Sequence, residues 1–290
     1  MLKVAHKILF LMLVGLGLSL SSQAKTKLCI WSYNMLFEHH VPADSAQQWA
    51  QRLPNALASI KRYKPDIIGS QELQTYQVEQ LVSESGYGWA GLGISHGDRK
   101  HVKDENEAIL YNKSRLDLLS SGMVWFSTTP SQAGSYSWGM KYPRACTWAK
   151  FKVRRTGQTL YVLNSHFYVD GDKEHARLEA AKLIMSQVHG AQVDAPVILT
   201  GDFNATISSL SLQYMLRDGS ISEARSLVSK PEGPAGSYHG FDRTHTPTRL
   251  IDHIFVTRDV KVKRYRVIDD QLLSGKWESD HLPVAVDIQF

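Results

Sequence analysis

The stretch PVILTGDFN, residues 196–204, is a short apolar segment that ends in two polar side chains. Its apolar residues predict a buried strand, and Asp202 and Asn204 would lose hydration there unless other polar groups surround them. Ser279-Asp280-His281 lies directly before a second apolar segment, Pro283–Ile288, and makes the same point. The two stretches predict a polar site built at the ends of strands.

Six further segments share this pattern of a short apolar run that ends in polar residues. They are Leu28–Asn34, Asp66–Glu72, Asn106–Asn112, Ala145–Lys152, Thr159–His166 and Ile251–Val256. Several are apolar almost throughout, which is typical of strands that are buried on both faces. The basic stretch from Lys261 to Arg266 alternates and predicts a strand with one solvated face.

Helices are expected between some of these strands. Pro54–Tyr63 predicts a helix with Pro54 in its first turn, Lys173–His189 a helix closed by Gly190, and Leu210–Asp218 a helix closed by Gly219. Strands outnumber helices and the two do not alternate strictly. We therefore expect an α/β fold, a four-layer sandwich of two packed mixed β-sheets flanked by helices.

The N-terminal residues differ from the rest of the chain. Lys3 and Lys7 precede an apolar run from Ile8 to Leu20, and small and polar residues lead to Ala24. A spanning helix needs about 20 apolar residues, so this run favours a cleavable signal peptide, residues 1–24, over a membrane anchor. No repeat or linker divides residues 25–290, which are expected to form a single catalytic domain of an exported, secreted or periplasmic, protein.

Charge and cysteine content leave several questions open. The formal net charge of +5 falls to +3 when the two lysines of residues 1–24 are removed, and those residues contain no acids. A mildly basic surface is compatible with an anionic substrate but does not select one.

Cys29 and Cys146 could form a disulfide in an oxidising compartment if their Cα atoms lie within about 7 Å. Two buried free thiols are an equally good interpretation.

The polar residues at the strand ends suit one kind of reaction. They are Asn34, Glu72, Glu105, Arg144, Asn164, His166, Asp202, Asn204, Asp252, Asp280 and His281. Hydrolysis of a phosphate ester needs a cation on the phosphate oxygens, donors for the transition-state charge, a base and an acid. Carboxylates and amides without thiolate clusters favour Mg²⁺ or Mn²⁺. The sequence has twelve histidines but no His-x-x-x-His or Cys-x-x-Cys pattern that supports zinc.

Six motifs in order resemble the endonuclease/exonuclease/phosphatase superfamily, whose members have the deoxyribonuclease-I-like fold. They are Ser32-Tyr33-Asn34, Gln71-Glu72, Asn164-Ser165-His166, Gly201-Asp202-Phe203-Asn204, Ile251-Asp252-His253-Ile254-Phe255 and Ser279-Asp280-His281-Leu282-Pro283. The stretch Trp125–Trp148 resembles the small exported bacterial metal-dependent hydrolases of that superfamily. Departures are Ser165, where the family more often has threonine, and His253, where tyrosine is commoner.

The resemblance assigns metal binding to one group of residues. It implies that Glu72 is the principal ligand of Mg²⁺ or Mn²⁺, with Asn34 and Asp280 completing or supporting the sphere. It also implies that Asp202 and Asn204 orient the attacking water and stabilise the pentavalent phosphate.

A second group of roles follows from the same resemblance. His281, held by Asp252, would act on the nucleophile side or on the phosphate. His166 is the candidate general acid, with Glu105 as its expected partner. Glu107 lies close enough in sequence to compete for that partner role. Arg144 resembles a phosphate-contacting arginine.

Two more residues are candidates for substrate contact. His239 lies in Tyr238-His239-Gly240-Phe241, a turn that resembles a loop near the family's site, and Trp138 lies in an aromatic insert beside Arg144. A structural turn and a core aromatic are the alternative interpretations.

These observations predict an exported, metal-dependent phosphoesterase that acts on a compact phosphate ester, in particular a phosphodiester. The alternatives are a secreted nuclease, with DNA or RNA as its substrate, and a catalytically silent binding module. We further expect a monomer with no stable membrane insertion after signal cleavage.

Overall fold

A computed structural model of the chain describes residues 25–38, 45–101, 103–170, 173–242, 244–270 and 277–290. The predicted signal segment, residues 1–24, lies outside the described residues. None of the helices in the described part of the chain has the length and apolar character that a membrane-spanning helix needs.

Two six-stranded sheets form the centre of the molecule. The first has the order β13-β14-β1-β2-β6-β4, from Lys261–Val267, Val284–Gln289, Lys27–Asn34, Ile67–Gln71, Ile109–Tyr111 and Gly88–Ala90. The second has the order β11-β12-β10-β9-β8-β7, from Ile221–Glu223, Asp252–Thr257, Val197–Asp202, Thr159–His166, Ala145–Val153 and Leu116–Trp125. A small third sheet pairs β3 (Leu73–Gln74) with β5 (Glu105–Asn106).

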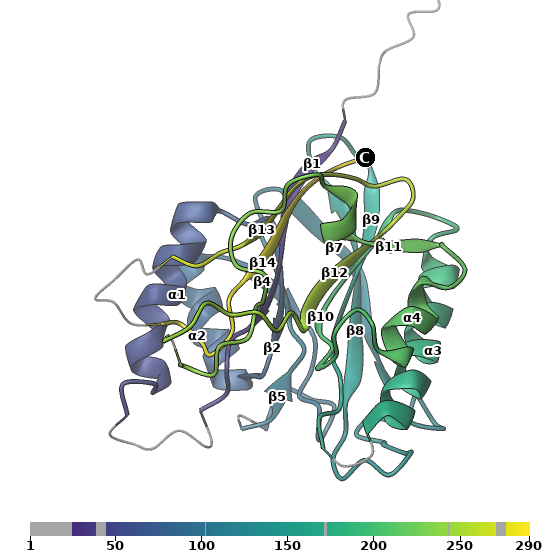
Figure 1. Cartoon of the computed structure of the whole chain (residues 1–290), viewed down its shortest axis with the longest axis horizontal. Coiled ribbons are helices and arrows are strands. Elements are labelled where there is room, and N and C mark those ends of the chain that lie inside the picture. Colours follow the sequence, from purple (N-terminus) through teal and green to yellow (C-terminus); the bar gives the residue numbers. More distant parts are fainter. Residues whose placement is uncertain (1–24, 39–44, 102, 171–172, 243, 271–276) are drawn as a thin grey trace, which may run out of the picture.

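Helices cover the outer faces of both large sheets (Figure 1). The helices α1 (Trp49–Tyr63) and α2 (Thr75–Ser85) pack on the first sheet, and α3 (Lys173–Ala191) and α4 (Leu210–Leu216) pack on the second. A short 3₁₀ helix, η1 (Ala224–Leu227), follows β11. The predicted α/β sandwich of two mixed sheets flanked by helices is confirmed.

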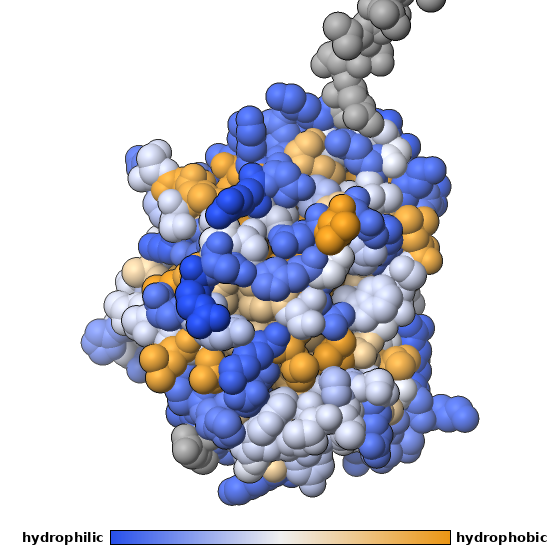
Figure 2. Space-filling model, turned by 90° about the vertical axis from the view of Figure 1, so that its right-hand side faces the viewer, coloured by the Kyte–Doolittle hydropathy of each residue, from blue (hydrophilic) through white to orange (hydrophobic). Residues whose placement is uncertain are grey.

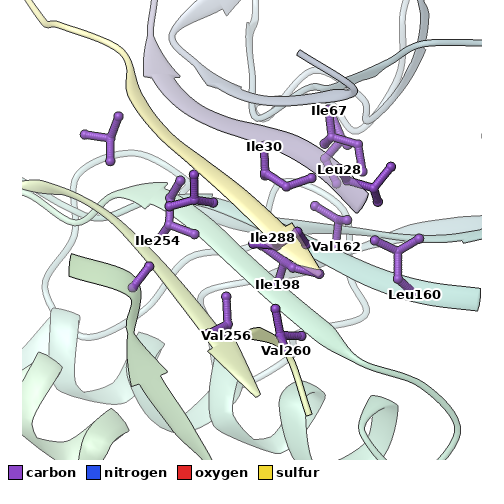
Figure 3. Packing of buried hydrophobic residues seen from close by; sticks show 14 of the residues in the cluster. Leu28, Ile30, Ile67, Leu160, Val162, Ile198, Ile254, Val256, Val260 and Ile288 are labelled. Carbon is purple, nitrogen blue, oxygen red and sulfur yellow. The ribbon is translucent and has the colours of Figure 1, made fainter. Parts of the chain in front are cut away.

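The apolar strand faces meet between the two sheets. Ile30 and Ile67 from the first sheet pack with Val162 and Ile198 from the second, all fully buried (Figure 3). Burial of each such aliphatic side chain stabilises the fold by about 1.5–3 kcal/mol. This shared core holds the two sheets at a fixed distance, and the site at their edge depends on that distance.

The first helix starts earlier than the sequence predicts. It begins at Trp49, so Pro54 lies inside the helix and not in its first turn. The Trp49 N–H, unsatisfied within the helix, donates to Glu38 Oε1 at 2.8 Å, which supports the earlier start. The helix α3 likewise continues past Gly190 to Ala191, and α4 ends at Leu216, two residues before Asp218.

Several elements have no counterpart among the sequence predictions, and the longest of them are α2 and β7. The helix α2 begins after Gln74, whose side chain forms a capping box with Gln77, and glutamine is not among the residues that usually signal a helix start. The strand β7 lies at the edge of its sheet, and its register shifts between Leu118 and Ser120. Its exposed serines hide the apolar pattern that marks a buried strand.

The outer surface over α3 and α4 is mainly hydrophilic, with separate hydrophobic side chains (Figure 2). Cys29 on β1 and Cys146 on β8 belong to different sheets and are both free thiols.

The two sheets place their polar strand ends at one edge of the sandwich. In the first sheet β1 and β2 run parallel, with Asn34 opposite Gln71. In the second sheet β9 and β10 run parallel, with His166 opposite Asp202. The side chain of Asn34 hydrogen-bonds Asp202 across the gap between the sheets, from Nδ2 to Oδ2 at 3.0 Å. The ends of four central strands therefore meet in one place.

Candidate active site

A cleft of about 590 Å³ opens where these strand ends meet. Eight of the predicted site residues line it: Glu72, Glu105, Arg144, His166, Asp202, Asn204, Asp280 and His281. Asn34 and Asp252 are fully buried and lie behind this lining, in hydrogen-bond contact with it. A cleft of this size accommodates a small organic molecule.

Glu72 is held in place by its backbone and by Asn34. It has φ +67, a left-handed conformation that is rare for a residue with a side chain, between β2 and β3. Asn34 Nδ2 donates to Glu72 Oε1 at 2.8 Å, while Asn34 Oδ1 accepts from the Leu36 N–H at 3.1 Å. Asn34 thus directs its amide nitrogen at Glu72 and Asp202 and holds both carboxylates in place. In this structure it supports the potential metal ligands.

The cleft concentrates negative charge around Glu72. Burial, and then the charges of Glu105 and Asp280, raise the pKa of Glu72 to about 8. A divalent cation bound here would relieve that repulsion. Glu72, His166 and Asp202 each place one potential ligand atom within 4.8 Å of the others. These atoms are two carboxylate oxygens and one imidazole nitrogen, and no thiolate is among them. This donor set fits a hard ion such as Mg²⁺ or Mn²⁺.

Asp202 lies at the centre of the site. Its Oδ2 accepts from Asn34, and its Oδ1 accepts the N–H of Asn204 at 2.8 Å. The same Oδ2 lies 3.5 Å from His166 Nε2 and 3.7 Å from His281 Nε2. Burial, and then the charge of Asp252, raise the pKa of Asp202 to about 6, against the opposing effect of His281. A carboxylate with this pKa can accept a proton near neutral pH.

His281 is backed by a buried carboxylate, as the sequence predicts. Its Nδ1 lies 2.8 Å from Asp252 Oδ2, which also accepts the Ser237 hydroxyl at 2.6 Å. Although burial disfavours a charged ring, the charge of Asp252 and the hydrogen bond to it raise the pKa of His281 to about 10. The ring is therefore cationic at neutral pH, with Nε2–H free to face the cleft.

His166 is backed by a cation. Arg144 Nη1 lies 2.9 Å from His166 Nδ1, and because arginine only donates, Nδ1 is the acceptor and the ring proton sits on Nε2. Burial, and then the charge of Arg144, hold the pKa of His166 well below its usual value. The amide nitrogen of Asn204 lies 3.0 Å from that Nε2 and donates one of its hydrogens to the Phe167 carbonyl at 3.1 Å. Asn204 Nδ2 and His166 Nε2 are both donors and cannot hydrogen-bond each other, so an anionic oxygen that accepts from both suits this part of the cleft floor.

The expected partnership of Glu105 with His166 runs through Arg144 in this structure. The same Arg144 Nη1 donates to Glu105 Oε2 at 2.6 Å, so the arginine lies between the carboxylate and the ring. Glu107, the competitor named from the sequence, is fully buried 3.8 Å from Arg144. Neither of its carboxylate oxygens has a hydrogen-bond partner, and burial raises its pKa well above the usual value.

Two predicted substrate contacts lie away from the cleft lining. Trp138 is partly buried against the core between the second sheet and its helices. His239 is buried beside Phe241, and its backbone N–H donates to the carbonyl of Asp280 at 3.0 Å, so it shapes the loop before His281. The aromatic residues that line the cleft are Phe37, Tyr142 and Tyr238.

Sequence reasoning also missed residues that position or surround the site. Arg52 of α1 is fully buried and donates to the carbonyls of Met35 and Glu278 at 2.6 and 2.8 Å. It thereby ties the end of β1 to the segment before Asp280. Lys103 and Arg249 are exposed cations on the cleft lining. Only a surplus of basic residues in the sequence pointed to them, without indicating which ones.

The sequence matches a family profile described as Endonuclease/Exonuclease/phosphatase family over residues 31–281. A curated relative, Protein angel of Drosophila melanogaster, is 21% identical over 202 residues. That match covers 66% of this chain and 55% of the relative, so the chain spans about half the length of that protein.

Two solved structures from Bacteroides thetaiotaomicron are each 30% identical to this chain. One is an endonuclease/exonuclease/phosphatase family protein with a TM-score of 0.85, covering 92% of this chain and 99% of that chain. The other is a mannosyl-6-phosphatase with a TM-score of 0.83, covering 91% of this chain and 100% of that chain.

Proposed function

The chain belongs to the endonuclease/exonuclease/phosphatase family, and we propose that it is a metal-dependent hydrolase of a compact organic phosphate ester. One observation carries the proposal. A single oxygen, Asp202 Oδ2, lies within 4 Å of both His166 and His281 and accepts from Asn34, the residue that also holds Glu72. A base, a cationic donor, a neutral donor and a metal ligand thus converge on one point of the cleft.

Glu72 and Asp280 are the proposed holders of Mg²⁺ or Mn²⁺, with Asn34 as the residue that orients Glu72. When bound, the ion supplies Lewis-acid stabilisation of the charge on the phosphate oxygens. The fit rests on the crowded carboxylates that raise the pKa of Glu72.

The protein groups supply the remaining parts of the reaction. Asp202 orients the attacking water and takes up its proton, consistent with a pKa of about 6. The cationic His281 donates from Nε2 to the phosphate as negative charge develops. Asn204 and His166 donate further hydrogen bonds. Because the ring of His166 is neutral, we assign it hydrogen-bond donation in place of the general-acid role expected from the sequence.

A sugar phosphate monoester is the first substrate class to test, since a 30%-identical relative is a mannosyl-6-phosphatase. A compact phosphodiester, the class expected from the sequence, is the second. It is favoured by the two exposed cations Lys103 and Arg249, which line the cleft and offer a place for a second substituent. We also propose that residues 1–24 direct export and are removed, which N-terminal sequencing of the exported protein would test.

One substrate panel tests the proposal. Purified protein with Mg²⁺ or Mn²⁺ is assayed against sugar phosphates, chromogenic mono- and diesters, sphingomyelin, phosphoinositides, RNA and plasmid DNA at two salt concentrations. We expect turnover of small esters that chelator abolishes and added Mg²⁺ or Mn²⁺ restores. Glu72→Ala should remain folded and lose the metal response, with Glu84→Ala on the exposed part of α2 as the matched control.

The same panel separates the rivals. A nuclease grips several phosphates, so rapid and strongly salt-dependent plasmid degradation without action on small esters would favour that alternative. Full activity in chelator would contradict metal dependence. A catalytically silent module would turn over none of the substrates and would show no stabilisation by Mg²⁺ in thermal unfolding.

A further inference from the structure

A loop between β4 and β5 carries a second group of imidazole and carboxylate side chains of the types that ligate metals, apart from the carboxylates around Glu72. The Ile94 N–H donates to the Glu105 carbonyl at 2.9 Å and closes the loop at its base. Within it, the Gly97 N–H donates to the Gly93 carbonyl at 2.7 Å, and Gly97 has φ +70. This turn brings His96 back beside His101.

The two imidazole rings lie face to face. Their centroids are 3.5 Å apart with an interplanar angle of 14°. One nitrogen of His96, one nitrogen of His101 and one carboxylate oxygen of Asp104 lie within 4.8 Å of one another. Ligands of a tetrahedral Zn²⁺ ion lie about 2.0–2.2 Å from the metal, so the three atoms are close enough to reach one ion once the rings turn.

Each ring already has a carboxylate partner. His96 Nδ1 lies 2.8 Å from Asp104 Oδ2, and His101 Nδ1 lies 2.8 Å from Asp98 Oδ1. A histidine that ligates a metal commonly donates its other ring N–H to a carboxylate, which fixes the ring and increases its basicity. Asp98 is placed to do this for His101, and His101 Nε2 is then the ligand atom.

One of the three side chains is held in place, and the other two are exposed enough to turn. Asp104 is only 9% exposed and also accepts the His96 N–H at 3.2 Å, so its carboxylate is fixed. The rings of His96 and His101 are 51% and 45% exposed and can turn about their side-chain torsions. Both rings must turn, because two stacked rings cannot direct in-plane lone pairs at one ion.

We propose that His96, His101 and Asp104 bind a divalent transition-metal ion such as Zn²⁺ on the rim of the cleft. The ion replaces the proton that His96 Nδ1 and Asp104 share; that proton leaves to solvent while Nε2 takes one up, so the ring ligates as a neutral imidazole. Two imidazoles and one carboxylate leave a fourth position for water, as in open zinc sites. Mg²⁺ prefers an all-oxygen shell and does not compete strongly.

This site has a consequence for the cleft that does not depend on the proposed reaction. Ser95, Lys103 and Asp104 of the same loop line the cleft, and the loop leads directly into Glu105. A metal that joins His96 to Asp104 ties the two sides of the loop together. It would therefore hold the substrate-facing side chains of this rim in one arrangement.

Binding of the metal alone tests the proposal. Metal-free purified protein is titrated with Zn²⁺ by calorimetry and with Co²⁺ by visible absorption, in excess Mg²⁺ to occupy the oxygen-rich site. We expect one tight Zn²⁺ site and a Co²⁺ spectrum of four-coordinate type. His96→Ala combined with His101→Ala should lose that site, and Asp98→Ala should keep it with affinity about 10–100-fold weaker.

His175→Ala and His189→Ala, which alter exposed histidines of α3, are the matched controls and should bind Zn²⁺ as the wild type does. Asp98→Ala leaves all three ligands in place, so it remains informative if the double variant fails to fold. Wild-type Zn²⁺ affinity and stoichiometry in the folded double variant would overturn the proposal. So would the absence of any Zn²⁺ binding by the wild type. Neither result depends on whether the protein hydrolyses a phosphate ester.

Discussion

Two histidines share the floor of the cleft and differ in the residue that stands behind each ring. His281 and His166 are both buried, and both direct Nε2 to the same oxygen of Asp202, at 3.7 and 3.5 Å. The residue behind His281 is the carboxylate of Asp252, and the residue behind His166 is the guanidinium of Arg144. The pKa of His281 is raised to about 10, and the pKa of His166 is lowered well below 6.5.

The comparison shows that residue type and burial do not determine what a histidine does. Burial alone would keep both rings neutral. The carboxylate behind His281 overcomes that effect, whereas the arginine behind His166 adds to it. One ring therefore presents a charged donor to the cleft, and the other presents a donor without charge.

The largest effect is expected where the charged pair is broken. His281→Ala and Asp252→Asn should each lower kcat by at least about a hundredfold, because the cationic donor is removed or no longer stabilised. Steady-state kinetics on the best substrate of the panel measures this. His189→Ala is the control, since it disrupts a histidine–carboxylate pair of the same 2.8 Å length on the surface. Near-normal turnover by either variant would remove the pair from the mechanism.

A smaller effect distinguishes the two rings directly. His166→Ala should lower kcat by about a hundredfold, and His166→Gln should recover about tenfold of that loss, because an amide N–H can replace a neutral imidazole N–H. His281→Gln should recover little, since glutamine cannot supply the charge. Equal recovery at both positions in the same kinetic assay would show that the charge difference is unimportant.

The smallest effect is expected on the free energy of unfolding, through Glu107, which lies beside Arg144. Glu107 is buried without a hydrogen-bond partner, and its pKa is raised well above 4.5. A group whose pKa is raised in the folded state stabilises the fold fully below its unfolded pKa and loses that contribution as pH rises. Glu107→Gln cannot ionise, so its free energy of unfolding relative to wild type should improve by more than about 1 kcal/mol from pH 5 to pH 8.

Chemical denaturation at fixed Mg²⁺ concentration measures that difference. Glu84→Gln, an exposed substitution at the end of α2, should show the same offset from wild type at both pH values. If Glu107→Gln instead destabilises the protein equally at pH 5 and pH 8, Glu107 is an ionised partner of Arg144.

The sequence predicts one half of this comparison well. Asp252 and His281 each occupy a strand end in a motif of the family, and strands that end at one edge bring such groups together. The same logic predicts the convergence of Asp202 with Glu72, and it predicts the two-sheet fold because the buried strands are apolar almost throughout. These features depend on local pattern and on topology alone.

The other half depends on packing that no local pattern records. Arg144 reaches both Glu105 and His166 only because β8 and the small β3–β5 sheet lie on the same side of the cleft. Trp138 looks like a substrate contact in the sequence, but its loop turns it against the core. Arg52 lies outside the helix that the sequence predicts, and its role depends on the longer helix α1, which covers the end of β1.

The left-handed backbone of Glu72 sets fold stability against activity. A non-glycine residue at φ +67 costs roughly 1–3 kcal/mol, and the crowded carboxylates add to that cost. Glu72→Gly would relieve both at once. Selection of this protein for heat resistance alone would therefore favour loss of the proposed metal ligand, and a search for thermostable variants has to screen for turnover at every round.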